Sequence, residues 1–235
     1  MSAPRGGPIE AIVFDFDGLI LDTEVPVYRS WQEIYEAHGC ELPLSTWAVC
    51  IGTDGAFDPH QHLEAQLGRA LDAGALEARH RERCDALIAR EAVRPGVLDY
   101  LAEARRLGLK RGVASSSSRR WVAGHLERLG MLEAFHALRC AGEVPRVKPA
   151  PDLYRAVLAE LGVAPARALA IEDSPNGIRA AKGAGMFCVA VPNALTRHLD
   201  LGEADLHLTS LAELPLGELL SRAARGDESG SRALA

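Results

Sequence analysis

The sequence predicts an α/β fold, in which a doubly wound parallel sheet carries an inserted all-helical cap domain. Short apolar runs recur along the chain, and segments with apolar residues at helical spacing lie between them. The runs are apolar throughout rather than alternating, which is typical of parallel strands that are buried on both faces. After the first run, residues 23–92 contain helical patterns and no such run. These observations indicate one sheet with one helical insertion.

Five apolar runs are the predicted strands, and the run that begins at His136 is the weakest of them. Ligands of doubly wound sheets bind beyond the carboxyl ends of the strands, so the residues directly after each run are candidate site residues. In order, the runs are AIVF (11–14), RGVA (111–114), HALRC (136–140), ALAI (168–171) and FCVAV (187–191).

Helical segments separate these strands and fill the insertion. In the sheet domain, apolar spacing predicts helices over 118–130 and 151–162, and each ends at a glycine, a favourable residue just past a helix end. In the insertion, one helix is predicted from about residue 23 to 39 and another over 74–91. The alternation of strand and helix predicts right-handed crossovers in the sheet.

The domain organisation follows from these elements. Residues 1–22 and 93–221 are expected to form the Rossmann-like core, and residues 23–92 the helical cap inserted after the first strand. The last segment, 222–235, is rich in glycine, serine and charge with few large apolar groups, so we expect a frayed tail.

Composition and charge exclude several classes of protein. A formal charge of −6 and a sequence pI of about 5.8 argue against binding to a nucleic-acid backbone. No run reaches the roughly 18 to 20 apolar residues that span a bilayer, and the first residues lack the apolar core of a signal peptide. We expect a cytoplasmic monomer that binds neither nucleic acid nor membrane. The five cysteines are widely spaced and predict neither a disulfide framework nor a zinc site.

Two carboxylates follow the first predicted strand. Asp15 and Asp17 point the same way if the chain stays extended, and Gly18 permits a tight turn. Neighbouring carboxylates repel one another, and a protein tolerates this mainly when a cation lies between them or when one carries a proton. Acid pairs at turns are common on surfaces, but this pair comes directly after a buried strand. The pattern therefore favours a functional site.

Two further segments carry groups that suit an anion. Ser115 to Ser118 lie between the second strand and a helix, where hydroxyl and backbone N–H groups converge. A serine run is as typical of a linker or a helix cap, and Ser118 is the candidate cap. Lys148 lies among three prolines before a helix, which gives its charge a stiff support, although a lone lysine is ordinarily solvated.

The predicted strand 168–171 is again followed by adjacent acids, Glu172 and Asp173. The carboxylates, the lysine and the serines would therefore meet at one edge of the sheet. Hard oxygen ligands favour Mg²⁺, which in proteins commonly holds a substrate phosphate as well. The lysine and the serines would neutralise the remaining phosphate oxygens. The residues themselves thus predict phosphoryl transfer.

Four motifs resemble those of the haloacid dehalogenase superfamily, in that family's order and at strand ends: DFDGLILDTE, ASSSS, VKPAPD and IEDSPNG. The resemblance extends to about Leu214. The DTE stretch followed by helices is most similar to the β-phosphoglucomutase-like phosphatases with a small helical cap. The resemblance implies a Mg²⁺-dependent phosphomonoester hydrolase that forms an aspartyl phosphate and acts on a small phosphorylated metabolite such as a sugar phosphate.

The resemblance also implies a role for each site residue. Asp15 would be the nucleophile, and Asp17 the general acid and base. Dehalogenases need no such acid, so Asp17 favours phosphate esters as substrates. Lys148 would act in catalysis by holding the transferring group. The implied metal ligands are Asp15, Asp17 through its backbone carbonyl, Glu172 directly or through water, and Asp173, and the implied phosphate ligands are Ser115, the Ser116 backbone and Lys148.

The cap is expected to decide the substrate, and here the chain departs from the mutase pattern. β-Phosphoglucomutases carry a cap arginine that grips a second phosphate, whereas this chain has no basic residue between Arg29 and Arg69. Hydrolysis is therefore favoured over the alternative, a β-phosphoglucomutase-type phosphomutase. An arginine of the second cap helix, Arg79, Arg81 or Arg83, is the candidate substitute.

Several other residues are given structural or surface roles. Asp22 is expected to stabilise the turn into the cap. His60 and His62 form an HxH pair, but no third ligand follows in a recognisable pattern, so a surface or substrate-facing role is favoured over zinc. Because Trp31 and Trp121 fall on apolar helix faces, both are expected in the core.

Two arginines near the motifs have no constrained pattern of their own. Arg146 is expected to be an ordinary surface charge. Arg119 follows the serine run and is a candidate substrate contact, but an arginine at a helix N-terminus is more often solvated. Neither residue is counted among the predicted site residues.

Two rival functions come from other classes of protein. Response-regulator receiver domains also carry acids, Mg²⁺ and a lysine at a sheet edge and are phosphorylated on aspartate. They need neither a cap nor an acid at the position of Asp17, which argues against a signalling module. A catalytically silent binding protein is disfavoured because every expected catalytic residue is present.

Overall fold

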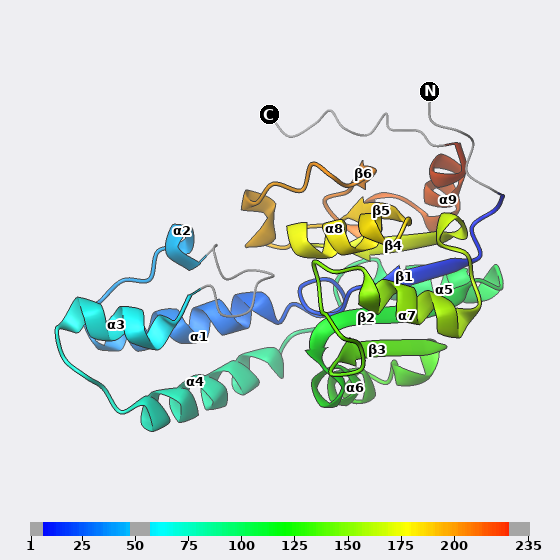
Figure 1. Cartoon of the computed structure of the whole chain (residues 1–235). Coiled ribbons are helices and arrows are strands. Elements are labelled where there is room, and N and C mark those ends of the chain that lie inside the picture. The colour runs from blue at the N-terminus through cyan, green and yellow to red at the C-terminus, as the bar shows by residue number, and fades with distance from the viewer. Residues whose placement is uncertain (1–6, 48–56, 226–235) are drawn as a thin grey trace.

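A computed structural model describes residues 7–47 and 57–225 (Figure 1). Six parallel strands form one sheet in the order β3-β2-β1-β4-β5-β6, which confirms the doubly wound α/β fold. The strands are β1 (Ala11–Phe14), β2 (Lys110–Ser118), β3 (Ala137–Ala141), β4 (Ala168–Glu172), β5 (Phe187–Ala190) and β6 (Leu206–His207).

The sheet is buried on both faces, as the continuous apolar runs predict. All four residues of β1 are fully buried, with Ile12 and Phe14 in one apolar cluster and Ala11 and Val13 in the other. This division follows from the alternation of side chains along a strand. The first cluster includes residues of α5 (Val97–Arg106), α6 (Arg119–Arg128) and α9 (Leu216–Arg225), and the second includes residues of α7 (Asp152–Leu161) and α8 (Pro175–Gly183).

The cap lies beside the sheet domain, beyond the carboxyl edge of β1 (Figure 1). It consists of α1 (Glu24–Ala37), α2 (Leu44–Trp47), α3 (Pro59–Leu67) and α4 (Ala73–Ile88). A separate apolar cluster joins these helices, and it includes the buried rings of Trp31 and Tyr35. Trp31 is therefore a core residue, as expected, but of the cap.

The two connections between cap and core run next to each other. Leu21 forms a bridge with Val93, and the backbone N–H of Arg94 donates to the carbonyl of Ile20 at 3.0 Å. The chain thus enters and leaves the cap at one place, which agrees with an insertion. We keep 23–92 as the proposed extent of this domain.

The structure corrects three details of the predicted elements. The serine run is the last part of β2 rather than a turn, because the strand continues past an irregularity between Ala114 and Ser118 and pairs there with β3. β6 was not predicted, and two residues are too short to give a periodic signal. The tail was predicted to begin at residue 222, but α9 continues to Arg225 and Ala223 is fully buried; residues 226–235 lie outside the described part of the chain.

Two further observations bear on the expected class of protein. Within residues 7–47 and 57–225, no helix has the length and apolar content that a membrane crossing requires. Four of the cysteines, Cys40, Cys84, Cys140 and Cys188, are free thiols, as predicted, and Cys50 lies outside the described residues.

Candidate active site at the carboxyl edge of the sheet

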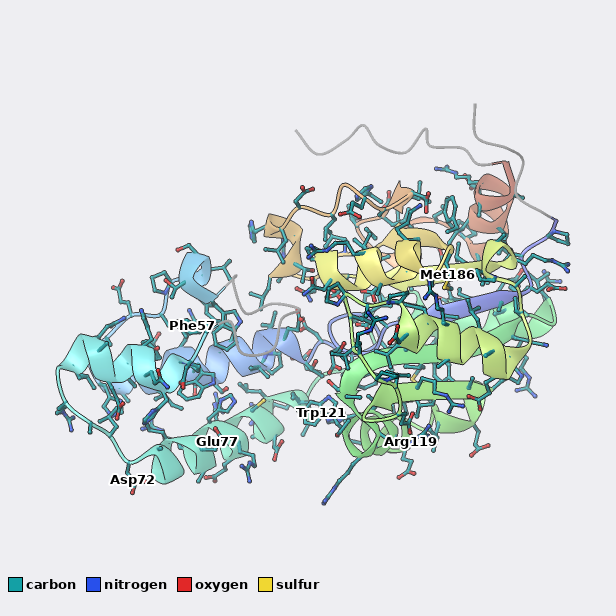
Figure 2. The ribbon with its side chains drawn as sticks, in the orientation of Figure 1. Phe57, Asp72, Glu77, Arg119, Trp121 and Met186 are labelled. Atoms are coloured by element: carbon teal, nitrogen blue, oxygen red, sulfur yellow. The ribbon has the colours of Figure 1, made fainter. Side chains whose placement is uncertain are left out.

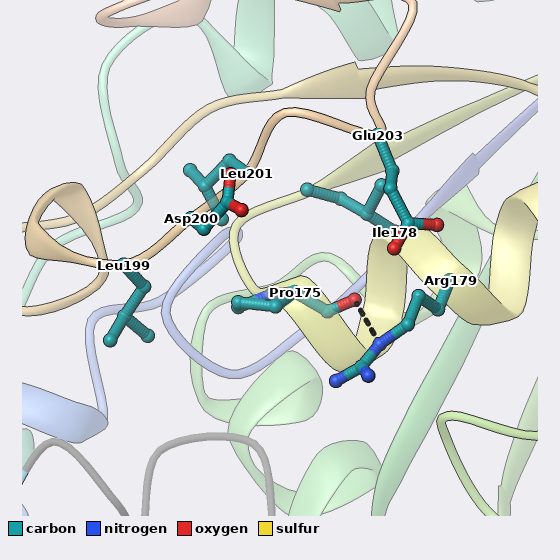
Figure 3. A pocket seen from close by; sticks show the side chains of 7 residues that line it. All are labelled: Pro175, Ile178, Arg179, Leu199, Asp200, Leu201 and Glu203. Carbon is teal, nitrogen blue, oxygen red and sulfur yellow. Dashed lines mark hydrogen bonds between the residues drawn. The ribbon is translucent and has the colours of Figure 1, made fainter.

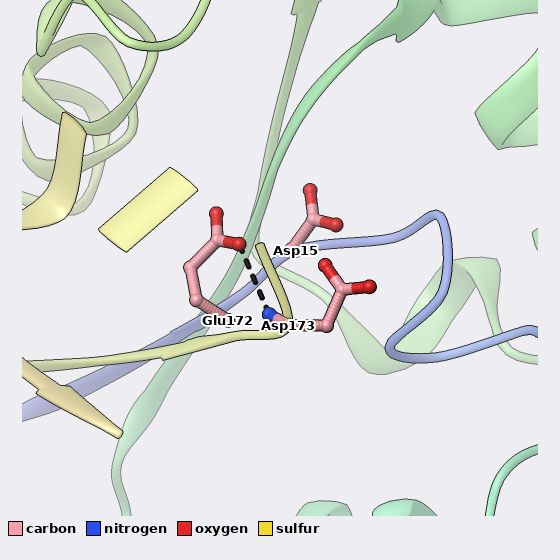
Figure 4. A group of neighbouring side chains, drawn as sticks. All are labelled: Asp15, Glu172 and Asp173. Atoms are coloured by element: carbon pink, nitrogen blue, oxygen red, sulfur yellow. Dashed lines mark hydrogen bonds between the residues drawn. The ribbon is translucent and has the colours of Figure 1, made fainter. Parts of the chain in front are cut away.

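The carboxyl ends of neighbouring strands bring three of the predicted acids together. Asp15 directly follows β1, Glu172 ends β4, and Asp173 is the next residue. β1 and β4 are paired neighbours in the sheet. Asp15 is 6% exposed, Glu172 0% and Asp173 1%. Figure 4 shows the three carboxyl groups gathered in one place, with the backbone N–H of Asp173 donating to Glu172 at 3.1 Å.

Lys148 supplies positive charge to this group. Its ammonium donates to Oδ1 of Asp15 and lies 2.6 Å from Oε1 of Glu172. The hydroxyl of Tyr154 donates to the same Glu172 oxygen at 2.6 Å, and the ammonium lies 5.3 Å from the centre of the Tyr154 ring. Because Tyr154 belongs to α7 and Lys148 to the loop before it, the packing of α7 positions both groups.

Asp173 is linked to the first cap helix. The side-chain amide of Asn193 donates to Oδ2 of Asp173 and to Oε2 of Glu24, both at 2.8 Å. Glu24 is the first residue of α1, and Asn193 follows β5. A carboxylate of the sheet edge and a carboxylate of the cap thus share one amide donor.

Two glycines allow these carboxylates to approach the backbone closely. Gly18 has φ +77°, and a Cβ atom there would lie 2.3 Å from Oδ2 of Asp173. A Cβ atom at Gly177, in α8, would lie 1.9 Å from the Glu172 carboxylate. Both contacts are shorter than any real carbon contact, so the DxDG and SPNG motifs need glycine at these positions.

Burial determines the electrostatics of the site. Burial raises the pKa of Asp15 and that of Asp173 well above the usual value, and neighbouring carboxylates raise both further. Burial opposes the charged form of Lys148, but Asp15 and Glu172 outweigh this effect and raise the pKa of the lysine. Burial also raises the pKa of Glu24 to about 7. The site therefore holds excess negative charge, which a proton or a cation would relieve.

The arrangement fits a divalent metal ion. Asp15, Glu172 and Asp173 each offer one oxygen, and these three oxygens lie within 4.8 Å of one another. Carboxylate oxygens are hard donors, which suit Mg²⁺ or Mn²⁺ rather than a soft metal. The identity of the metal is not fixed by this geometry. Among the described residues, the hydroxyl of Ser116 is buried without a hydrogen-bond partner, whereas those of its neighbours Ser115 and Ser117 donate to Asp17.

Asp17 has a different environment from Asp15. Its Oδ1 accepts hydrogen bonds from the hydroxyl of Thr23 and the indole N–H of Trp121, both at 2.8 Å. Its Oδ2 accepts from the hydroxyls of Ser117 at 2.7 Å and Ser115 at 3.2 Å. Trp121 is only partly buried, so the expectation that it is simply a core residue is corrected: one face packs on the core, and its N–H reaches Asp17.

A family model described as hydrolase, haloacid dehalogenase-like hydrolase, matches residues 9–185, which include every predicted site residue. The chain belongs to this hydrolase family. The match confirms the resemblance carried by the four motifs, and within the haloacid dehalogenase-like fold, helices α1–α4 are the cap region.

Similar haloacid dehalogenase-like proteins share most of the chain's length. The YhcW protein of Bacillus subtilis is 49% identical over 212 residues, covering 90% of this chain and 96% of that protein. Hexitol phosphatase B of Escherichia coli is 31% identical over 227 residues, covering 94% and 100%. Beta-phosphoglucomutase of Bacillus subtilis is 31% identical over 192 residues, covering 78% and 83%.

Among solved structures, CbbY from Rhodobacter sphaeroides in complex with phosphate is similar in sequence and fold. Its TM-score is 0.66 and its sequence identity 36%, covering 88% of this chain and 96% of that one. A CbbY variant crystallised with xylulose-(1,5)bisphosphate has a TM-score of 0.64, with the same identity and coverage. CbbY therefore binds phosphate-bearing ligands on this haloacid dehalogenase-like fold.

The other residues with predicted roles can now be placed in the haloacid dehalogenase-like fold. Asp22 accepts a hydrogen bond from the N–H of Val25 at 3.1 Å, so its structural role at the start of the cap is confirmed. Ser118 accepts from the N–H of Trp121 at 3.3 Å and caps α6, as predicted. Arg146 pairs with Asp152 at 2.9 Å on the surface.

Arg119 and the two cap histidines form contacts with residues other than the clustered carboxylates. Arg119 forms an ion pair with Glu143, and its side chain is 48% exposed, so its guanidinium is partly solvated and has a fixed partner. Nδ1 of His62 lies at hydrogen-bond distance, 3.0 Å, from the hydroxyl oxygen of Tyr35, and the two rings are stacked. The imidazole of His60 lies 3.6 Å from the carboxylate of Glu64, one turn further along the same helix.

A pocket beside α8 is separate from the candidate active site (Figure 3). Pro175, Arg179, Asp200 and Glu203 are among its lining residues, and none of the clustered carboxylates is. The guanidinium of Arg179 donates to the carbonyl of Pro175 at 3.3 Å and also to Asn176. Since two acids and one engaged arginine line this pocket, it does not suit a phosphate.

Sequence reasoning missed four residues of this site: Thr23, Glu24, Tyr154 and Asn193. Thr23 and Glu24 belong to the DTE motif, but that pattern predicts no role for them, and Ser117 was expected with the other serines to face an anion rather than to donate to Asp17. The only sequence feature that could have pointed to Tyr154 is its position three residues after Pro151, near the lysine motif. No sequence feature pointed to Asn193. Both reach the carboxylates only because α7 and the segment after β5 fold back onto the same sheet edge.

Proposed function

We propose that the chain is a Mg²⁺-dependent phosphomonoester hydrolase that acts on a small phosphorylated metabolite, a sugar phosphate, through an aspartyl phosphate. The observation that carries the proposal is the contact between Asp15 and Lys148 beside Glu172 and Asp173. It supplies a carboxylate nucleophile, a fixed cation and hard metal donors within one buried group.

Two displacement steps at phosphorus account for hydrolysis. In the first, a carboxylate oxygen of Asp15 attacks phosphorus, the bond from phosphorus to the ester oxygen breaks, and that oxygen takes a proton from Asp17. In the second, water attacks the phosphorus of the aspartyl phosphate and gives a proton to Asp17, and Asp15 leaves. The products are the alcohol and inorganic phosphate, and both aspartates return to their starting state.

Charge neutralisation is the main task of the remaining residues. Lys148 would face the transferring phosphoryl group together with Ser115 and the Ser116 backbone. Asp15, the Asp17 carbonyl, Glu172 and Asp173 would hold Mg²⁺. When bound, Mg²⁺ neutralises phosphate oxygens and allows a carboxylate to approach an anion.

The relatives support a phosphate ester as substrate. Hexitol phosphatase B is named for a sugar-alcohol phosphate, and CbbY was crystallised with a sugar bisphosphate and with phosphate. A hexitol phosphate and xylulose-(1,5)bisphosphate share a polyhydroxylated carbon chain that carries phosphate. We therefore place this chain's substrate in the same chemical class.

The main rival is a phosphomutase of the β-phosphoglucomutase type. The cap stretch that would carry its phosphate-gripping arginine falls partly at 48–56, outside the described residues. Of the candidate substitutes on α4, Arg83 already pairs with Glu33 at 2.6 Å. Arg81 pairs with Glu77 at 3.4 Å, which leaves Arg79. Hydrolysis therefore stays favoured on the sequence of the cap stretch, and Arg79 is the candidate substitute on this helix.

A receiver domain is disfavoured by the helical insertion. The family match covers the chain from β1 through α8, and four helices interrupt the sheet domain after β1. Receiver-type signalling requires no such insertion. Turnover of free metabolites would separate the two classes directly.

The decisive experiment is phosphate release from a panel of small sugar and sugar-alcohol phosphates, with Mg²⁺ or with a chelator. We expect metal-dependent release from several esters, with a ranking that reflects the cap. β-Glucose 1-phosphate is tested with and without a bisphosphate primer. Its conversion to glucose 6-phosphate with little phosphate freed would establish the mutase instead, and no turnover of any ester would reject both enzymes.

A further inference from the structure

The carboxylate of Asp17 has no acceptor position left unused. It accepts four hydrogen bonds, two on each oxygen, from Thr23 and Trp121 and from Ser115 and Ser117. A carboxylate offers about four lone-pair directions. A substrate oxygen can therefore approach Asp17 only where one of these donors gives way.

The four donors are not equivalent. A hydroxyl of serine or threonine rotates about its C–O bond and both donates and accepts, whereas an indole N–H only donates and lies fixed in the plane of its ring. Thr23 and Trp121 share Oδ1, and the serines share Oδ2. The oxygen that faces the indole thus has the more rigid partner.

The Trp121 ring is itself held in place. Its backbone N–H is capped by Ser118, and its ring meets His125 edge to face with centroids 4.4 Å apart. His125 in turn stacks on Phe16 at 6.2 Å, one residue before Asp17. Figure 2 shows Trp121 on the side of the sheet domain that faces the cap. Ring contacts therefore link Phe16, which precedes Asp17 in the chain, through His125 to the Trp121 indole that donates to Asp17.

We propose that Trp121 is a positioning residue for Asp17. Its indole N–H holds Oδ1 of Asp17 in place, and Oδ2 remains able to exchange its serine partners for the ester oxygen of the substrate. This inference rests on the proposed function, in which Asp17 is the general acid and base. Ser115 and Ser117 lie at the end of β2, where the phosphoryl group is expected. Because both serines donate to Oδ2, this oxygen is the one closer to the expected position of the reacting phosphorus and ester oxygen. Trp121 contacts Asp17 and not the reacting atoms.

The first test is the Trp121→Phe substitution, which removes the N–H and keeps a ring that packs on His125. We expect kcat for the preferred ester to fall about tenfold, with KM changed by less than about twofold, because a loosened acid affects the chemical step and not substrate binding. Gly124→Ala is the matched control on the same helix: among the described residues, no atom beyond the chain neighbours and the backbone of its own helix lies within 4 Å of the added methyl group, and kcat should not change.

A second test does not depend on activity. The protein has three tryptophans, and indole N–H signals can be resolved by ¹⁵N-labelled NMR. In the Asp17→Ala variant, we expect the Trp121 signal to move strongly upfield as its charge-assisted hydrogen bond is lost, while those of Trp31 and Trp47 stay. A Trp121 signal indifferent to Asp17→Ala would overturn the inference even if Trp121→Phe proves unstable.

The outcomes separate this inference from the proposed function. A wild-type enzyme that releases phosphate, together with an unchanged kcat in Trp121→Phe, rejects the role of Trp121 and keeps the phosphatase. A wild-type enzyme that releases no phosphate rejects the phosphatase and with it the positioning role. A tenfold loss in kcat with a shifted indole signal supports both.

Discussion

The carboxyl edge of the sheet and the helical cap treat charge in opposite ways. At the sheet edge, Glu172 is 0% and Lys148 9% exposed. In the cap, the side chains of Arg83 and Glu33 are paired but 38% and 35% exposed. The interior of the cap is aromatic and apolar instead, as around Trp31. One region buries its ionised groups and the other keeps them in water.

The comparison shows that this chain buries charged groups, at an energetic cost, at the sheet edge and not in the cap. Taking charged groups out of water is unfavourable unless they are fully paired, whereas exposed ion pairs contribute little in either direction. Substitutions at the sheet edge should therefore separate activity from stability, and substitutions of cap ion pairs should change neither by much.

The largest effect is expected for Asp15→Asn. The amide cannot form an aspartyl phosphate, so phosphate release should fall by about 10⁴-fold. The substitution also removes a buried charge, so the fold should remain, as measured by circular dichroism. Residual activity within tenfold of wild type would mean that another residue is the nucleophile.

Asp173→Asn should move activity and stability in opposite directions. Losing a metal ligand should lower metal-dependent phosphate release by about 10²-fold or more. Because burial raises the pKa of Asp173, its ionised form destabilises the folded protein at neutral pH. In chelator at pH 7.5, the variant should therefore melt about 3 °C or more above wild type. A lower melting temperature would show that the charge is well compensated without metal.

Gly177→Ala should break the sheet edge sterically. The added methyl carbon would lie 1.9 Å from the Glu172 carboxylate, so helix α8 or the carboxylate must move. We expect a loss of about 3 kcal/mol in the free energy of unfolding together with a large loss of activity. Gly124→Ala in α6 meets no neighbouring atom and should instead gain up to about 1 kcal/mol. Equal effects in denaturant titrations would contradict the close approach.

Glu24 offers a pH test of the link between cap and sheet. Its pKa in the folded protein is about 7 because of burial, against an ordinary value of 4.5. A raised pKa means that its contribution to stability is present at pH 4.5 and below and is lost as pH rises through about 7. In the metal-free protein, Glu24→Gln should therefore raise the melting temperature by about 3 °C at pH 8 and leave it unchanged at pH 4.5. Parallel pH curves for the two proteins would contradict burial of an ionised Glu24.

The smallest effect is expected in the cap. Arg83→Ala removes an exposed pair with Glu33 and should leave the free energy of unfolding nearly unchanged. Turnover of monoesters should not change. A loss of turnover confined to bisphosphate substrates would show that Arg83 leaves Glu33 and binds a second phosphate. That result would favour the phosphomutase over the phosphatase.

The same comparison explains what the sequence could predict. At the sheet edge, motif residues directly follow strands, and parallel pairing must bring strand ends together, so the sequence alone is enough to group Asp15, Lys148, Glu172 and Asp173. In the cap, apolar spacing predicts helices but not which charged residues pair. The Arg83–Glu33 pair joins two helices that are far apart in sequence, and no local pattern encodes it.

The errors have physical causes as well. Trp121 falls on an apolar helix face, and the spacing that predicts burial is the same whether or not the ring also directs its N–H at Asp17. Ser115 to Ser118 have weak strand preference, but β2 continues through them and pairs again with β3 at Ser118. Asn193 reaches Asp173 only through tertiary folding, so it left no signal in its own neighbourhood.

The most direct test of the account is to trap the intermediate. Wild-type protein mixed with its best ester and Mg²⁺ is quenched in acid and reduced with borohydride, which converts an aspartyl phosphate to homoserine, and the peptides are sequenced by mass spectrometry. The account predicts homoserine at position 15 and nowhere else, and none in the Asp15→Asn variant. Homoserine at Asp17, or none at any position despite steady phosphate release, would contradict it.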